Sequence, residues 1–135
     1  MSDELNKFTK SWEENPSEMF KAFVTLKEHL ESIENLELTF VGRPGVTYSL
    51  RAKHQNQKDR NLFGMLDVID DDPDDRWLSI CFYEDYLTDP NEMGDMVPGG
   101  LAGDDAYCFD LDEFNEGDVK YLAERLTEAS KNAAL

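Results

Sequence analysis

The spacing of the apolar residues changes twice along this chain, and the two changes limit the folds it can adopt. Between positions 20 and 33 the apolar side chains recur every three or four residues, as they do on one face of an α-helix. Between positions 36 and 82 apolar and polar residues alternate instead, which is typical of strands with one buried face. The helical period returns near the C-terminus. The apolar positions of the two helical stretches are Phe20, Phe23, Leu26, Leu30 and Ile33, and then Val119, Leu122, Ala123, Leu126 and Ala129.

The alternating region divides into short strands. Four segments, 36–40, 46–52, 62–68 and 78–82, are separated by turn residues or acidic stretches, and Ala106–Leu111 reads as a last strand. Short connections favour antiparallel neighbours. One face of these segments is mostly apolar and the other is mixed, as in a sheet that helices cover on one side only. We therefore predict an α+β, two-layer fold: a mostly antiparallel sheet of about five strands, with an early and a C-terminal helix packed on one face.

The length of the chain fits one folding unit, so residues 1–135 are predicted to form a single domain. The N-terminal segment is its most separable part. Leu5, Phe8 and Trp12 share one face of a short helix over 3–14, which Pro16 interrupts. Residues 1–15 are therefore predicted to form a helical arm that serves for docking.

Two cysteines, Cys81 and Cys108, are too few and too far apart for a disulfide framework, and neither belongs to a CxxC pair. Both are predicted to be reduced, buried thiols. No apolar run approaches the roughly 18 residues of a membrane span, and Met1–Lys10 lacks the basic and apolar regions of a signal peptide. The expected location is the cytoplasm, without membrane contact.

Acidic side chains dominate the second half of the chain. The formal net charge is −17, yet residues 1–60 carry nine Lys or Arg against ten Asp or Glu, whereas residues 61–135 carry four against twenty. Such a field repels nucleic acid and anionic membranes, so neither is an expected partner. Two clusters form the predicted surface for a basic partner protein: Asp70, Asp71, Asp72, Asp74 and Asp75, and then Asp104 and Asp105. Solubility alone is the other explanation of this acidity.

The acidic run at 70–75 does not have the spacing of a calcium loop, which needs a glycine at its sixth position and a glutamate at its twelfth. No metal and no cofactor are therefore expected. Catalytic motifs are also missing from the sequence, since His29 and His54 have no partner in a recognisable pattern. These observations favour a non-catalytic protein over an enzyme.

A basic connection interrupts this acidic chain between two of the predicted strands. Its basic residues are Arg51, Lys53, His54, Lys58 and Arg60. Guanidinium and ammonium groups bind phosphate and also pair with carboxylates. The segment is therefore a candidate site for a phosphate ligand, or for the acidic half of a second copy in a homodimer. An ordinary solvated loop is the alternative.

Residues 86–105 contain two prolines and four glycines and show no period of their own, so they are predicted to form a lid or a mobile loop. A cleft beside this loop is predicted to involve Tyr48, Asp67, Trp77, Tyr83 and Tyr86. Two hypotheses for the function follow. The first is a non-catalytic interaction or ligand-binding module with an acidic surface. The alternative is a small-molecule-binding protein or an enzyme that uses the cleft.

The order of these elements, together with Tyr48, Leu62–Val68 and the segment Asp118–Leu126, resembles a group of small bacterial domains of unknown function. These are the YdhG-like and predicted-transport-protein-type domains, and the resemblance covers residues 20–131. It implies a bacterial α+β domain and carries no established activity. Such domains often have basic and aromatic residues in the middle strands, whereas Asp67–Asp75 is acidic here, which argues against a shared site.

Overall fold

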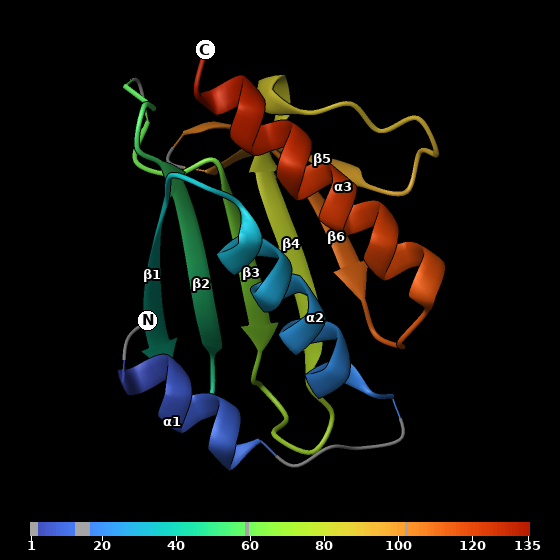
Figure 1. Cartoon of the computed structure of the whole chain (residues 1–135). Coiled ribbons are helices and arrows are strands. Elements are labelled where there is room, and N and C mark those ends of the chain that lie inside the picture. The colour runs from blue at the N-terminus through green and yellow to red at the C-terminus, as the bar shows by residue number, and fades with distance from the viewer. Residues whose placement is uncertain (1–2, 13–16, 59, 102) are drawn as a thin grey trace.

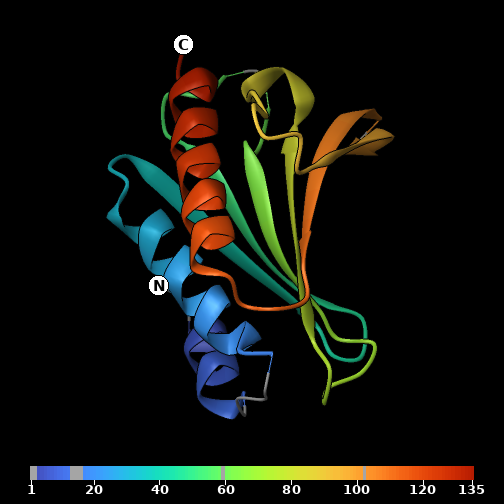
Figure 2. The same ribbon diagram turned by 90° about the vertical axis from the view of Figure 1, so that its right-hand side faces the viewer.

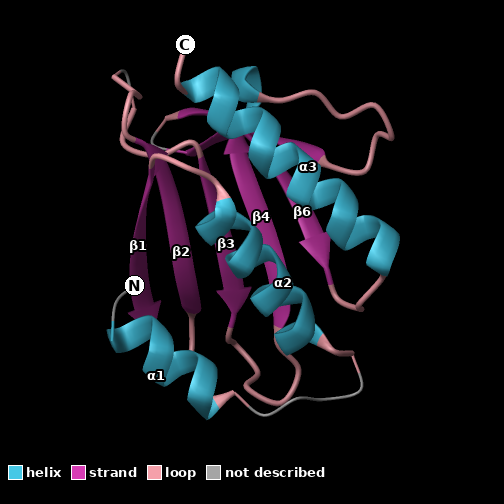
Figure 3. Ribbon diagram, viewed as in Figure 1, coloured by secondary structure: helices cyan, strands magenta, loops and turns pink. Residues whose placement is uncertain are grey.

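The structure, a computed structural model, describes residues 3–12, 17–58, 60–101 and 103–135. Two helices come first, then four strands, a short 3-10 turn, two further strands and a last helix (Figures 1 and 3). The helices are α1 (Asp3–Ser11), α2 (Met19–Ser32) and α3 (Glu116–Ala133). The strands are β1 (Leu36–Arg43), β2 (Thr47–His54), β3 (Gly64–Ile69), β4 (Trp77–Tyr83), β5 (Asp95–Leu101) and β6 (Asp104–Leu111), and the turn is η1 (Glu84–Tyr86).

All strand pairs in the sheet are antiparallel, and the strand order is β1-β2-β3-β4-β6-β5. The predicted α+β fold is confirmed, with six strands in place of about five. The additional strand, β5, lies within residues 86–105, so the prediction of one irregular loop there is wrong. Because Pro98, Gly99 and Gly100 interrupt the alternation of apolar and polar residues, the sequence pattern does not predict this strand. Its register with β6 shifts between Val97 and Leu101.

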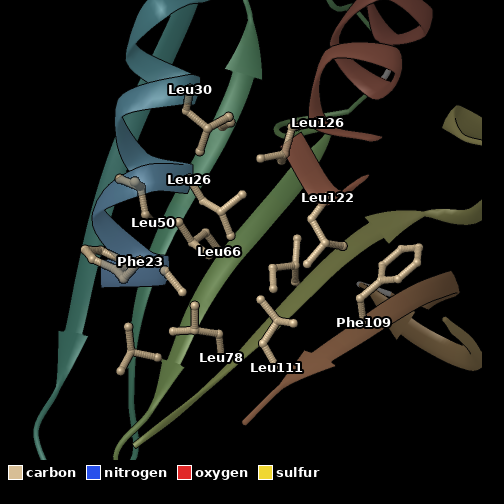
Figure 4. Close-up of a cluster of buried hydrophobic side chains, with 14 of the residues drawn as sticks. Phe23, Leu26, Leu30, Leu50, Leu66, Leu78, Phe109, Leu111, Leu122 and Leu126 are labelled. Atoms are coloured by element: carbon tan, nitrogen blue, oxygen red, sulfur yellow. The ribbon is translucent and has the colours of Figure 1, made fainter. Parts of the chain in front are cut away.

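The helices lie on one face of the sheet, and the hydrophobic core fills the space between the two layers (Figure 2). Figure 4 shows how side chains from α2 and α3 meet those of the central strands. Eight of them are at most 1% exposed, namely Phe23, Leu26, Leu30, Leu50, Leu66, Leu78, Leu122 and Leu126. The period of 3.6 in the helices and the period of two in the strands therefore converge on the core between the two layers, as the sequence predicts.

Helix α1 packs into this core and is not a free arm. Leu5, Phe8 and Trp12 are at most 7% exposed, and the Phe8 ring stacks on Tyr48 with 4.0 Å between ring centroids. The guanidinium group of Arg76 lies over the rings of Phe8 and Trp12, 5.2 Å from each centroid. Residues 3–12 of the segment predicted for docking thus make contacts within the chain, and its other residues lie outside the described ones. Its interrupting residue, Pro16, lies outside the described residues.

Cys81 and Cys108 form a disulfide, so the prediction of two reduced thiols is wrong. The two residues are separated by 27 positions in sequence, but they lie directly opposite each other in the pairing of β4 with β6. Their Cα atoms are 4.1 Å apart. The sequence does not reveal this contact because it does not show that β6, and not β5, is the neighbour of β4. Structural disulfides are typical of oxidising compartments, so this bond does not support the predicted cytoplasmic location. That location stays a prediction.

Candidate functional site

The face of the sheet opposite the helices carries the candidate site, and we call it the open face. No described helix covers it (Figure 2). Because side chains alternate along a strand, the odd-numbered residues of β2, β3 and β4 and the even-numbered residues of β6 point to this face. They include Arg51, Lys53, Met65, Asp67, Trp77, Ser79, Cys81, Cys108 and Asp110.

Charge on the open face changes sign from one side of the sheet to the other. The basic residues Arg51 and Lys53 lie on β2, whereas Asp110 and Asp95 lie on β6 and β5. The strand register places Arg51, Met65, Cys81, Cys108 and Asp95 in one row across the sheet. The adjacent row contains Ser49, Asp67, Ser79 and Asp110. The disulfide therefore separates the basic side of the open face from its acidic side.

Asp67 is a half-buried carboxylate in the middle of the open face. Its Oδ1 atom is buried and accepts no hydrogen bond from the described part of the chain. Burial raises the pKa of Asp67, while Ser49 and Arg51 act to lower it. Arg51 itself donates from Nε to the Ser49 hydroxyl oxygen over 3.2 Å. A buried carboxylate oxygen without a donor is costly, so a donor from outside the chain would stabilise it.

The acidic side of the open face consists of Asp95, Asp110 and Asp112, which we call the acidic strip. All three side chains are exposed, and none forms an ion pair with any residue that the structure describes. Partial desolvation and the nearby charges of Asp95 and Asp112 raise the pKa of Asp110. The strip is therefore a place where like charges repel one another and no cation of the described chain relieves the repulsion.

The acidic residues that the sequence singles out do not form one surface. Asp71, Asp72, Asp74 and Asp75 lie in the turn between β3 and β4, whereas Asp104 and Asp105 lie at the start of β6. Because these positions adjoin opposite ends of β4, about 20 Å of strand separates them. Asp70 is buried, at 3% exposure, and it pairs with Arg76 over 2.6 Å. Asp70 therefore holds the turn in place and cannot belong to a partner surface.

The basic residues of the predicted phosphate site are also dispersed. Arg51 and Lys53 reach the open face, while Lys58 lies exposed in the following loop and His54 Nδ1 accepts from the Asn56 N–H group. Arg60 has carboxylate partners of its own. It lies 2.7 Å from Asp85 and 3.4 Å from Asp104, and its guanidinium group covers the rings of Tyr83 and Tyr86. A phosphate would have to compete with two carboxylates for Arg60.

The residues of the predicted cleft face different sides of the molecule. Tyr48 packs against Phe8 on the helix side, whereas Asp67, Trp77 and Tyr83 point to the open face, and Tyr83 and Tyr86 hold Arg60. Two adjoining hollows of about 680 and 690 Å³ lie instead on the outer surface of α2 and α3, where they share His29, Lys120 and Ala123. Within the described residues, no group of His, Cys, Asp and Glu side chains is arranged to hold a metal ion.

Asp89 is a structurally important residue that the sequence pattern does not single out. It accepts hydrogen bonds from the hydroxyl groups of Tyr107 on β6 and Tyr121 on α3, and from the N–H groups of Met93 and Gly94. Partial burial raises its pKa, but these hydrogen bonds outweigh burial and bring the pKa down to about 2. Asp89 thereby fixes the connection between η1 and β5 against the last helix.

The unfolding free energy is expected to fall as the pH is lowered from about 4 to 2. The folded-state pKa of Asp89 is below its ordinary value of 3.8, so its stabilisation is complete above that value and is lost as the carboxylate is protonated. The expected loss is up to about 2 kcal/mol. Urea unfolding between pH 5 and 2 measures it, with Asp89→Asn as the comparison. Parallel curves for the two proteins would exclude this role of Asp89.

Comparison with known proteins gives no relative from which a function can be transferred. No family model, no curated protein and no solved structure matches the chain. The resemblance to the YdhG-like domains therefore stays a prediction. Among the described helices, none is both long enough and apolar enough to cross a bilayer.

Proposed function

We propose that this protein is a non-catalytic binding module whose open face receives a basic segment of a partner protein. The observation that carries the proposal is the acidic strip, whose carboxylates have no cationic partner among the described residues. The same face also holds Asp67, whose buried Oδ1 atom accepts no hydrogen bond from the described residues. Lysine and arginine side chains supply both a positive charge and hydrogen-bond donors. A basic segment would therefore meet both requirements at once.

The arrangement of the strands gives such a segment a direction. Asp67 and Asp110 are in one row, and β4 lies between their strands, so two strand spacings, about 10 Å, separate their backbones. An extended segment that crosses the strands can span this distance with three residues. The half-exposed side chains of Trp77 and Cys81 offer apolar contact close to this path. The net charge of −17 would attract such a partner from a distance and make its association rate dependent on salt.

The small-molecule or enzyme alternative has weaker support. Its cleft residues do not all share one face, since Tyr48 points to the helices whereas Asp67, Trp77 and Tyr83 point to the open face. In addition, β5 occupies part of the segment that was to form the lid. No other arrangement of the described side chains favours a particular reaction. We therefore place the functional interaction on the open face.

Replacing two carboxylates of the acidic strip is expected to weaken binding of a short peptide rich in Lys and Arg. Asp95→Asn/Asp110→Asn should raise the Kd about tenfold at low salt, since each lost charge pair is worth on the order of 0.5 to 1 kcal/mol. Isothermal titration calorimetry at 50 and 300 mM salt measures the change. The higher salt concentration should weaken the wild type more than the variant.

The matched control removes the same number of charges from the turn between β3 and β4. Asp71→Asn/Asp75→Asn changes two exposed carboxylates in that turn and is expected to alter the Kd less than twofold. Equal effects of the two double variants would mean that only the overall charge attracts the peptide. That result would refute a binding site on the open face.

A further inference from the structure

The outer edge of β1 is suited to pairing with another strand. β1 is an outermost strand of the sheet, and its eight residues pair with β2 in one continuous register. It contains no proline and no lysine, two residues that commonly protect edge strands from association. The opposite edge differs, because β5 contains Pro98 and has an irregular register. The β1 edge is therefore the one that is open to regular pairing.

The hydrogen bonds at the ends of β2 show which peptide groups of β1 point outward. The Asn35 carbonyl accepts from the Gln55 N–H group over 2.8 Å, and the Val46 carbonyl accepts from Asp70 N–H over 2.9 Å. The direction of peptide groups alternates along an antiparallel strand. The odd-numbered residues of β1 therefore bond to β2, and the even-numbered residues, from Leu36 to Gly42, direct their N–H and C=O groups away from the sheet.

The charges around the two edges favour β1 for contact between identical chains. β1 carries one acidic residue, Glu37, and one basic residue, Arg43, and residues 1–60 are almost neutral as a whole. β5 and its neighbour β6 contain Asp95, Asp104, Asp105 and Asp110, which would repel the same residues of a second copy. Self-association of a chain with a net charge of −17 is least opposed where its local charge is balanced.

We propose that β1 pairs antiparallel with β1 of a second copy, around a two-fold axis at Phe40, so that the two sheets become one. Side chains alternate between the two faces along each strand. If the helices of both copies lie on the same side of the joined sheet, even-numbered residues must therefore pair with even-numbered residues, and odd-numbered with odd-numbered. Centring the pair on Phe40 places Glu37 of each copy opposite Arg43 of the other and Leu38 opposite Gly42. About six backbone hydrogen bonds form in this register.

Hollows on the helix side of β1 fit the same arrangement. One, of about 290 Å³, is lined by Leu30, Ile33, Leu36 and Leu38 together with Glu31. The other, of about 400 Å³, lies beside Phe40 and Gly42 and includes Phe8 and Tyr48. Because the pairing is antiparallel, the first hollow of each copy would adjoin the second hollow of the other. The partly exposed apolar side chains along β1 would then be covered by the partner copy.

Charge reversal tests the proposed register. Arg43→Glu creates two like-charge pairs per dimer, because the new Glu side chain of each copy lies opposite Glu37 of the other. The dimer dissociation constant is expected to rise at least tenfold. Glu37→Arg should do the same, although Glu37 also faces Lys53 in its own chain. The double variant Glu37→Arg/Arg43→Glu restores both pairs and should return the dissociation constant to within about threefold of the wild type. Sedimentation equilibrium from 1 to 200 µM measures these values.

Glu124→Arg, which makes the same charge change as Glu37→Arg at an exposed position of α3, serves as the control and should leave the dimer intact. Circular dichroism and thermal unfolding identify any variant that fails to fold. A wild-type protein that stays monomeric at 200 µM would overturn the proposal, and would leave the β1 edge to a strand from another protein. An unchanged dimer dissociation constant in Arg43→Glu would overturn it as well. So would a double variant whose dissociation constant does not return towards that of the wild type.

Discussion

Reduction of the disulfide between Cys81 and Cys108 is expected to lower the free energy of unfolding by about 3 to 4 kcal/mol. The bond closes a loop with a sequence separation of 27. The conformational entropy that the unfolded chain gains when a loop of this length is opened corresponds to this loss of stability. The loop contains η1, β5 and the segment that Asp89 fixes to α3. The loss should therefore appear as lower stability of the whole domain, because β6 also pairs with β4 throughout this region.

Urea unfolding with and without a phosphine reductant measures this effect. The variant Cys81→Ala/Cys108→Ala is the control, since its stability should match that of the reduced wild type and should not respond to reductant. Thiol titration of the denatured wild type should detect no free thiol before reduction. Two reactive thiols at that stage would show that the bond does not form in solution.

Arg76→Ala is expected to lower the free energy of unfolding by about 3 to 5 kcal/mol. The substitution leaves Asp70, 3% exposed, as a buried carboxylate without its cation. It also removes the guanidinium group that covers Phe8 and Trp12, so the packing of α1 should loosen. The Asp70 carboxylate also accepts a hydrogen bond from the Gly45 N–H group over 2.9 Å. Loss of Arg76 should therefore also disturb the turn between β1 and β2.

Chemical unfolding followed by Trp fluorescence measures this loss. Asp71→Asn, at the exposed residue next to Asp70, is the matched control and should change stability by less than about 0.5 kcal/mol. Asp70→Asn/Arg76→Met removes both charges and should be more stable than Arg76→Ala alone. If Arg76→Ala and Asp71→Asn had equal effects, the pair would be solvated and the assignment of Asp70 to the interior would fail.

Local patterns predicted most of the fold. The alternation at 62–68 corresponds to β3, in which every second residue is buried, and Asn115 caps α3 by accepting from the Asp118 N–H group over 3.0 Å. Strand β5 was not predictable in this way, because Pro98 and two glycines give it no alternating pattern. The disulfide was not predictable either, since it depends on which strands become neighbours, and sequence spacing carries no information about that.

The candidate site was predictable in composition but not in position. The sequence gives the acidity of the second half, yet it does not distinguish Asp70, which Arg76 holds in the interior, from the exposed Asp71 beside it. Asp110 belongs to the site because strand register brings it near Asp67, although the two residues are far apart in sequence. Asp89 is similar, because its two tyrosine partners come from β6 and α3 and no local motif connects them.

The position of β6 between β4 and β5 has a consequence for synthesis on the ribosome. β6 is translated last among the strands, so β4 has no neighbour on one side until about residue 111 has emerged. The β4 sequence, WLSICFY, is apolar, uncharged and free of proline, like segments that aggregate through strand pairing. A nascent chain that stalls before residue 104 presents this strand to other polypeptides. Safe folding of this protein therefore depends on translation from β4 through β6 without a pause.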